Sequence, residues 1–105
     1  MTEITLAELL EYSKNLKENE LILDVRTPEE FASGHIRGAK NIPHTEVLGS
    51  LEELKSYDTI YIHCKRGGRA VTAADQLVAA GVTSLKVLSS GGMDDWLAFG
   101  YPVES

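Results

Sequence analysis

A short strand that runs directly into a helix, with a cysteine at the junction, constrains this 105-residue chain more than any other feature. The run from Thr59 to His63 is β-branched and aromatic, which is typical of a strand. After it, apolar residues recur with the helical period and predict a mostly buried helix: Ala70, Val71, Ala73, Ala74, Leu77 and Val78. Cys64, the only cysteine of the chain, lies in the turn between the two elements.

The chemistry of this turn favours an anion. Within five residues it holds two glycines and three cations: Lys65, Arg66, Gly67, Gly68 and Arg69. Glycines let the backbone curl tightly, because they reach φ and ψ values that are closed to other residues. The start of a helix adds free N–H groups and the positive end of the helix dipole. Such surroundings favour the thiolate form of Cys64, so the turn predicts a nucleophile that holds an anion.

Composition narrows the function classes. The chain is 43% hydrophobic and 25% charged, which is typical of a globular domain, and its length suits one domain over residues 1–105. A net charge of −6 disfavours nucleic acid and anionic membranes as partners, since both need a basic face. The three cations beside Cys64 are a local exception that suits a small anion.

Several kinds of site are not expected. A single cysteine excludes an intramolecular disulfide and a CxxC redox pair. His35, His44 and His63 lack metal-ligand spacing, so no metal or cofactor is expected.

No apolar run is long enough to span a membrane, and the first residues lack the features of a signal peptide. The expected location is the cytoplasm.

The first half of the chain gives clear boundary signals. Thr5 and Glu8 form a capping box, which predicts a helix over residues 6–16 after an edge strand at 3–5. The apolar run 21–25 is typical of a strand that is covered on both faces of a parallel sheet. Thr27, as N-cap before a proline, opens a second helix that should end at Gly34. A strand is expected over residues 39–42.

The second half of the chain also predicts alternating helices and strands. Residues 44–57 predict a helical segment in two pieces, because Gly49 interrupts it and Ser50 with Glu53 offers a new capping box. Gly81 should end the helix that follows Cys64. A strand over residues 84–88 and a short helix over 93–99 complete the pattern. Strands that alternate with helices predict an α/β domain with a mainly parallel sheet, and ligands of such sheets bind beyond the carboxyl ends of the strands. Cys64 lies at such an end.

Three segments together carry a resemblance. They are LILDVRTPEEF at residues 21–31 with GHIRGA at 34–39 and NIP at 41–43; Cys64 with its glycine-rich, cationic turn; and Gly91-Gly92, Trp96 and GYPV at 100–103. With these motifs the chain resembles the rhodanese family of sulfurtransferases, and the resemblance covers about residues 4–103. Ser89 and Ser90 depart from the family pattern, in which a larger residue is usual before the two glycines.

The resemblance implies one rhodanese-like domain of three layers, with a central, mainly parallel sheet and helices on both faces. It also implies that Cys64 takes sulfane sulfur from a donor such as thiosulfate and carries it as a persulfide. The acceptor would be a thiophile: cyanide in an assay, or a thiol, a dithiol or a partner protein. The residues implied to surround the substrate are Lys65, Arg66, Gly67, Gly68 and Arg69.

Other polar residues have simpler expected roles. Asp24, Arg26 and His35 belong to the first motif, and we expect them to stabilise loops rather than to react. His63 precedes Cys64 in a strand, so its side chain should point to the opposite face, and we do not assign it as a general base. His44 is expected near a helix start or at the surface, and Trp96 in the core. Two roles fit Arg69: a second contact with the anion, or a clamp that holds the turn against an acid.

Two other function classes fit parts of the pattern. A phosphatase or arsenate reductase of similar fold needs five residues between its cysteine and arginine, whereas four separate Cys64 from Arg69. The shorter loop suits a single sulfur atom. A binding or regulatory module of this fold would tend to lack the cysteine. A sulfur carrier that serves one specific partner remains compatible with every motif.

Overall fold

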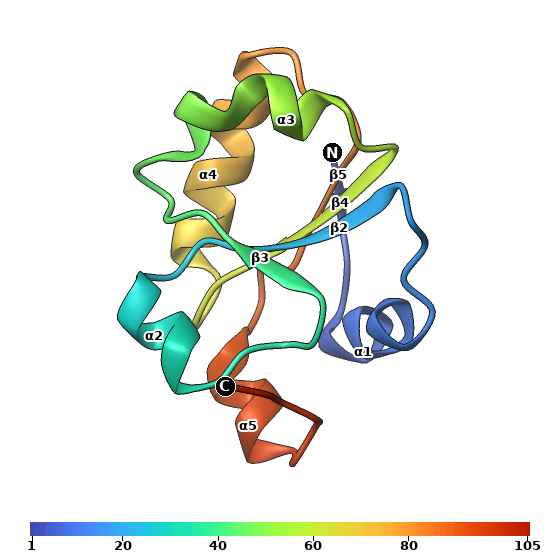
Figure 1. The fold of residues 1–105 in the computed structure, drawn as a ribbon, viewed down its shortest axis with the longest axis vertical. Helices are drawn as coiled ribbons and strands as arrows, with labels where there is room; N and C mark the ends of the chain where they lie inside the picture. The colour runs from blue at the N-terminus through green and yellow to red at the C-terminus, as the bar shows by residue number, and fades with distance from the viewer.

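The strand that precedes Cys64 is the central strand of a five-stranded parallel sheet in the computed structural model, which describes residues 1–105 (Figure 1). The strands, in the order β1-β5-β4-β2-β3, are β1 (Thr2–Glu3), β2 (Glu20–Asp24), β3 (Ala39–Asn41), β4 (Thr59–His63) and β5 (Leu85–Val87). The helices are α1 (Leu6–Lys14), α2 (Pro28–Ser33), the 3-10 helix η1 (Val47–Ser50), α3 (Leu51–Lys55), α4 (Gly68–Ala79) and α5 (Met93–Ala98).

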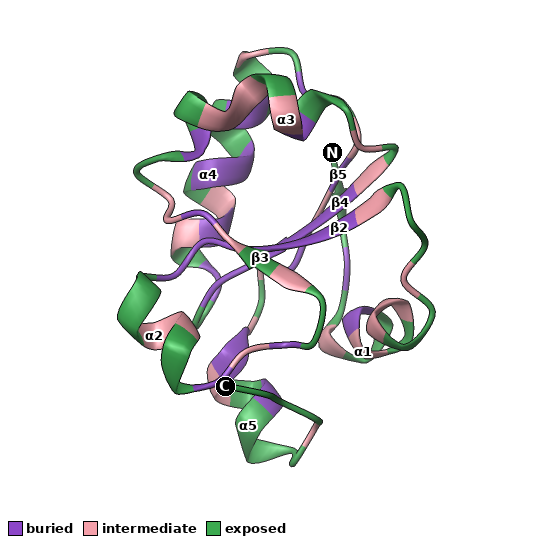
Figure 2. Cartoon of the chain, in the orientation of Figure 1, coloured by how far each residue is buried: buried purple, intermediate pink, exposed green.

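Helices cover both faces of the sheet, which confirms the predicted three-layer α/β fold. On one face η1, α3 and α4 pack on the odd positions of β2 and the even positions of β4, such as Leu23 and Ile62. On the other face α1 and α5 pack on Ile22 and Tyr61. Figure 2 shows β2 and β4 buried along most of their length. Because both faces are covered, the two strands are apolar without alternation. No helix has the length and apolarity needed to cross a membrane.

Helix ends follow the local signals in three places. The hydroxyl of Thr5 accepts a hydrogen bond from the N–H of Glu8 at 3.1 Å, and the Glu8 carboxylate accepts one from the N–H of Thr5 at 2.9 Å. Thr27 and Glu30 form the same capping box at the start of α2. Gly81 follows α4 with a φ of +97°, a conformation that glycine adopts without strain.

Other expectations need correction. The segment 44–57 does divide into two helical pieces, but Ser50 makes no capping hydrogen bond. Its φ of −116° and ψ of 22° are not those of an N-cap, because η1 runs directly into α3. Glu53 instead pairs with Lys40. The predicted strands and helices also end earlier at several places: α1 at Lys14 rather than residue 16, and β3 at Asn41.

The prediction that Val78 is buried in α4 is wrong. Ala70, Ala73, Ala74 and Leu77 are fully buried, but Val78 is 44% exposed. Position 78 lies about 100° around the helix axis from position 77, so it faces away from the sheet.

We predict that Leu77→Ala lowers the free energy of unfolding by about 2–5 kcal/mol, because it opens a cavity in the core. Val78→Ala is the matched control on the same helix and should change it by less than about 0.5 kcal/mol. Urea unfolding followed by circular dichroism measures both. Equal losses in the two variants would contradict the packing of α4 against the sheet through Leu77.

Candidate functional site

Cys64 lies between the end of β4 and the start of α4, at the carboxyl edge of the sheet. Its side chain is buried, and its Sγ accepts two hydrogen bonds from the backbone. The N–H of Gly67 donates at 3.1 Å and that of Ala70 at 3.3 Å. Backbone donors on a sulfur favour its anionic form. The strand end and the helix start thus place the sulfur within reach of two backbone donors.

Further N–H groups of the Cys64 loop (residues 64–69) have no partner in the protein. The N–H groups of Lys65, Arg66, Gly68 and Arg69 form no hydrogen bond to a backbone or side-chain acceptor. For Gly68 and Arg69 this follows from position, because the first N–H groups of a helix have no acceptor one turn earlier. The α4 dipole points its positive end at the same turn. The loop can therefore donate several hydrogen bonds to an anion.

The predicted residues meet at one pocket. A hollow of about 430 Å³ is lined by Cys64, Lys65, Arg66, Gly68 and Arg69. Gly67 does not line it but donates to the sulfur from below. The structure thus brings together all six residues that the sequence singled out. No cluster of three His, Cys, Asp or Glu side chains has a geometry that could hold a metal ion.

Arg69 forms a two-pronged ion pair with Glu30 of α2. Its two terminal nitrogens donate to the two carboxylate oxygens at 2.7 and 3.1 Å. These hydrogen bonds lower the pKa of Glu30 from 4.5 to about 2, although burial opposes the shift. The same pair raises the pKa of Arg69. Of the two roles considered for Arg69, the structure shows the contact with an acid, and that contact ties α4 to α2.

The other two cations of the loop are more exposed. Arg66 donates from Nε to the Oδ2 of Asp94 at 3.1 Å, and its side chain is 81% exposed. An ion pair in water is weak, so this contact opens readily. Lys65 is exposed and has no acidic partner. The charge that remains free for a bound anion therefore lies mainly on Lys65 and Arg66.

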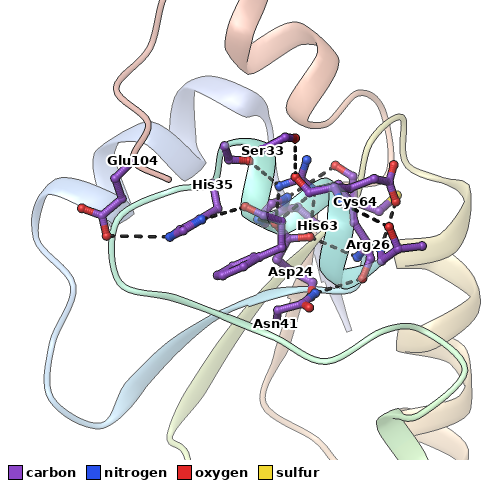
Figure 3. A network of polar contacts seen from close by, with 12 residues as sticks. Asp24, Arg26, Ser33, His35, Asn41, His63, Cys64 and Glu104 are labelled. Carbon is purple, nitrogen blue, oxygen red and sulfur yellow. Dashed lines mark hydrogen bonds and ion pairs between the residues drawn. The ribbon is translucent and has the colours of Figure 1, made fainter.

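A buried polar network lies beneath the loop, and Figure 3 shows it. Arg26 donates to the Asp24 carboxylate from its side chain at 2.7 Å and from its backbone N–H at 3.0 Å. It also donates to the carbonyl of Gly34 at 2.8 Å. Asn41 donates to the carbonyls of Asp24 and Arg26. These bonds satisfy the backbone where β2 and β3 end, which confirms the structural roles expected for Asp24 and Arg26.

His35 is also structural, as expected. Its ring stacks on Phe31 with centroids 3.8 Å apart, and its Nδ1 lies 2.8 Å from the Phe31 carbonyl oxygen. Its Nε2 lies 3.8 Å from the carboxylate of Glu104, so it joins α2 to the end of the chain (Figure 3). Trp96 is a core residue, since it is buried and donates from Nε1 to the carbonyl of Pro102 at 2.8 Å.

His63 points to the face opposite Cys64, as the strand pattern predicted. Cys64 belongs to the core beneath α4, whereas His63 approaches the carboxylate of Asp24, with 3.9 Å between its Nε2 and Oδ2. The side chain is fully buried and its Nε2 has no hydrogen-bond partner. Burial lowers the pKa of His63, and the Asp24 charge opposes this only in part. Because its ring lies on the face opposite the sulfur, His63 is not placed to take a proton from Cys64.

Two acidic neighbours of the loop were not identified from the sequence. Glu30 lies 39 residues before Arg69, and Asp94 lies 28 residues after Arg66. Both are acids in the first turn of a helix, where an acid is already explained by the positive end of the helix dipole. Their presence in the sequence therefore does not indicate an ion pair with the loop. Local sequence patterns predict no pairing over such separations, and only the fold brings these acids to the loop.

Comparisons with known proteins agree on the family. The family model described as "Rhodanese-like domain" matches residues 7–99. Over 95 residues the chain is 38% identical to thiosulfate sulfurtransferase 16, chloroplastic, of Arabidopsis thaliana, with 79% of the chain and 78% of that protein covered. It is 30% identical to thiosulfate sulfurtransferase GlpE of Pseudomonas putida, with 85% and 79% covered. The chain spans about half the length of several other curated relatives.

A solved structure supports the same conclusion for the fold. The crystal structure of a rhodanese-related protein from Thermoplasma volcanium superposes with a TM-score of 0.81 at 30% identity. The superposition covers 99% of this chain and 98% of that one. The fold is therefore shared over almost the whole length of both chains.

The Glu30–Arg69 pair predicts a pH-dependent stability. The folded pKa of Glu30 lies below its unfolded value, so the pair stabilises the fold above about pH 4.5 and is lost as the pH falls toward 2. Glu30→Gln should lower the free energy of unfolding at pH 7 by about 1 kcal/mol, with solvent screening allowed for. The exposed Glu29→Gln is the matched control: Glu29 lies in the same helix turn but pairs with no cation, so its variant should have a much smaller effect. Urea titrations at several pH values measure this, and a difference that stays constant down to pH 3 would contradict it.

Proposed function

Because the chain belongs to the rhodanese-like domain family, we propose that it is a sulfurtransferase whose Cys64 carries sulfane sulfur as a persulfide. The observation that supports this most is the environment of the sulfur. It is the only thiol of the chain, it accepts two backbone hydrogen bonds, and it faces a pocket with free donors.

The first step loads the sulfur. The Cys64 thiolate attacks the outer sulfur of thiosulfate, a new S–S bond forms, and the S–S bond of thiosulfate breaks. Sulfite leaves with the electron pair of that bond, so the persulfide keeps one negative charge and no proton is needed. The unpartnered N–H groups of Lys65, Arg66, Gly68 and Arg69 are the donors available for the terminal sulfur.

The second step unloads it. A thiophilic acceptor attacks the terminal sulfur, the persulfide S–S bond breaks, and Cys64 leaves as the thiolate. With cyanide the product is thiocyanate. A thiol, a dithiol or a partner protein would react at the same atom. The fully buried α4 side of Cys64 leaves only the pocket side for this attack.

The charges of the loop suit an anionic donor. Lys65 and Arg66 are exposed at the rim of the pocket, where they can attract the sulfonate oxygens of thiosulfate. Arg69 also lines the pocket, but its guanidinium is engaged by Glu30. In this proposal Lys65 and Arg66 bind the donor, while Arg69 holds the loop in place.

The same pairing disfavours the phosphatase alternative. A phosphoryl oxyanion spreads charge over several oxygens and is best held by a free, two-pronged arginine. Only four residues separate Cys64 from Arg69, and both terminal nitrogens of Arg69 already donate to Glu30. A compact loop whose donors reach one sulfur fits a persulfide better than a phosphate.

We predict that Cys64→Ser abolishes thiosulfate:cyanide turnover, with a loss of at least about 1,000-fold, because the hydroxyl is a poor nucleophile without an adjacent base. The fold should persist, since serine is close in volume, and circular dichroism checks this. Ser33→Ala, which changes an exposed side chain away from the pocket, is the control that should retain turnover. Turnover of the Cys64→Ser protein at the wild-type rate would remove Cys64 from the mechanism.

A further inference from the structure

The end of the β5–α5 connection and the first residues of α5 pack along the Cys64 loop. We call residues 91–94 the clamp segment. Three consecutive carbonyls of the loop accept hydrogen bonds from backbone N–H groups of this segment: Cys64 from Met93 at 2.9 Å, Lys65 from Asp94 at 3.2 Å, and Arg66 from Gly91 at 3.3 Å. The clamp segment thus holds three successive peptide groups by their oxygen atoms.

This arrangement decides where the N–H groups of those peptides point. All peptide bonds of the chain are trans, and in a trans peptide the C=O and the N–H point in opposite directions. With the carbonyls fixed toward the clamp segment, the N–H groups of Lys65, Arg66 and Gly67 must turn away from it. For Gly67 the result is visible, because its N–H donates to the Cys64 sulfur at 3.1 Å.

The close approach requires a residue without a side chain. A Cβ on Gly92 would collide with the carbonyl oxygen of Cys64 and would lie 2.5 Å from that of Lys65. The backbone of Gly92 is extended, with a φ of 174°, so the need for glycine there comes from lack of space. On the loop side, a Cβ on Gly67 would lie 2.9 Å from the carbonyl carbon of Ser89. Gly92 therefore faces the contact between the clamp segment and the loop, and Gly67 faces Ser89, which lies just before the clamp segment.

The clamp segment is itself anchored. The side chain of Met93 is buried in the core under α5, and Asp95 accepts a hydrogen bond from the N–H of Gly92 at 3.1 Å. The position of the clamp segment is therefore fixed by contacts of its own, independently of the loop.

We propose that the clamp segment orients the peptide groups of the Cys64 loop for sulfur transfer, and that Gly92 is a positioning residue for this reaction. The effect on turnover rests on the proposed function, whereas the orientation of the loop can be measured without it. The carbonyl contacts keep the N–H groups of the loop available to the sulfur in both the thiolate and the persulfide state.

The main test compares Gly92→Ala with Gly49→Ala. A methyl group on Gly49 would have no atom within 4 Å, and Gly49 has no positive φ, so its variant should match the wild type. Gly92→Ala should push the loop carbonyls away and lower kcat for thiosulfate:cyanide transfer about 100-fold, the usual effect of a misplacement near 1 Å. KM should change much less. In ¹H–¹⁵N NMR spectra the amide signals of residues 65–70 should move, while those of β2 stay.

A second pair keeps the test decisive if Gly92→Ala does not fold. Asp95 is exposed, so Asp95→Ala should fold, and the loss of its bond to the Gly92 N–H should loosen the clamp segment. We expect kcat to fall, by less than in Gly92→Ala, and the amide signals of the loop to shift. Asp75→Ala, at an exposed site on α4, is the matched control and should change neither.

The outcomes separate the positioning role from the proposed function. Wild-type kcat and unshifted loop amides in folded Gly92→Ala, or in Asp95→Ala if the first does not fold, would overturn the positioning role. Reduced stability with unchanged loop amides would also overturn it, because the segment would then only pack. If the wild type shows no sulfur transfer at all, the proposed function fails, and the amide shifts of the variants alone decide the positioning role.

Discussion

The hydrogen bonds from the backbone to the sulfur of Cys64 are the interaction on which the rest of the site depends. Two N–H groups reach the sulfur, and four more in the same loop have no partner in the protein, so the shape of the loop decides where these donors point. Here the start of α4 supplies N–H groups without helical acceptors, and Gly67 adopts a φ of +120° to turn the chain. The clamp segment holds the carbonyls on the other side. Each contact keeps donors available on the pocket side of the loop.

The charged side chains are also arranged to favour an anion at the pocket. The chain carries a net charge of −6, yet three cations gather at the Cys64 loop. Arg69 is held by Glu30 and Arg66 loosely by Asp94, which leaves Lys65 without an acidic partner. Beneath the loop, the buried Asp24–Arg26 pair satisfies backbone groups where the strands end. The charges of this buried pair offset each other, while the cations of the loop line the pocket.

Local signals in the sequence predicted much of this arrangement. The strand, the turn with Cys64 and the start of α4 follow from residue types over about twenty positions. The capping box at Thr5 and the N-cap at Thr27 are confirmed. Ser50 failed as a cap because the preceding 3-10 helix already fixed its backbone. The partners of Arg66 and Arg69 could not be predicted, since each lies 28 residues or more away along the chain. The contacts of the clamp segment could not be predicted either, because backbone atoms make them; the sequence singled out Gly91 and Gly92 only as part of a motif, without their partner.

The most direct test of the central claim is mass spectrometry of the protein after incubation with thiosulfate, under non-reducing conditions. If Cys64 carries the sulfur, the protein gains the mass of one sulfur atom, located on the peptide that contains Cys64. Cyanide should then remove this sulfur and release an equal amount of thiocyanate. Sulfur transfer to cyanide without any added sulfur on Cys64 would contradict the persulfide mechanism.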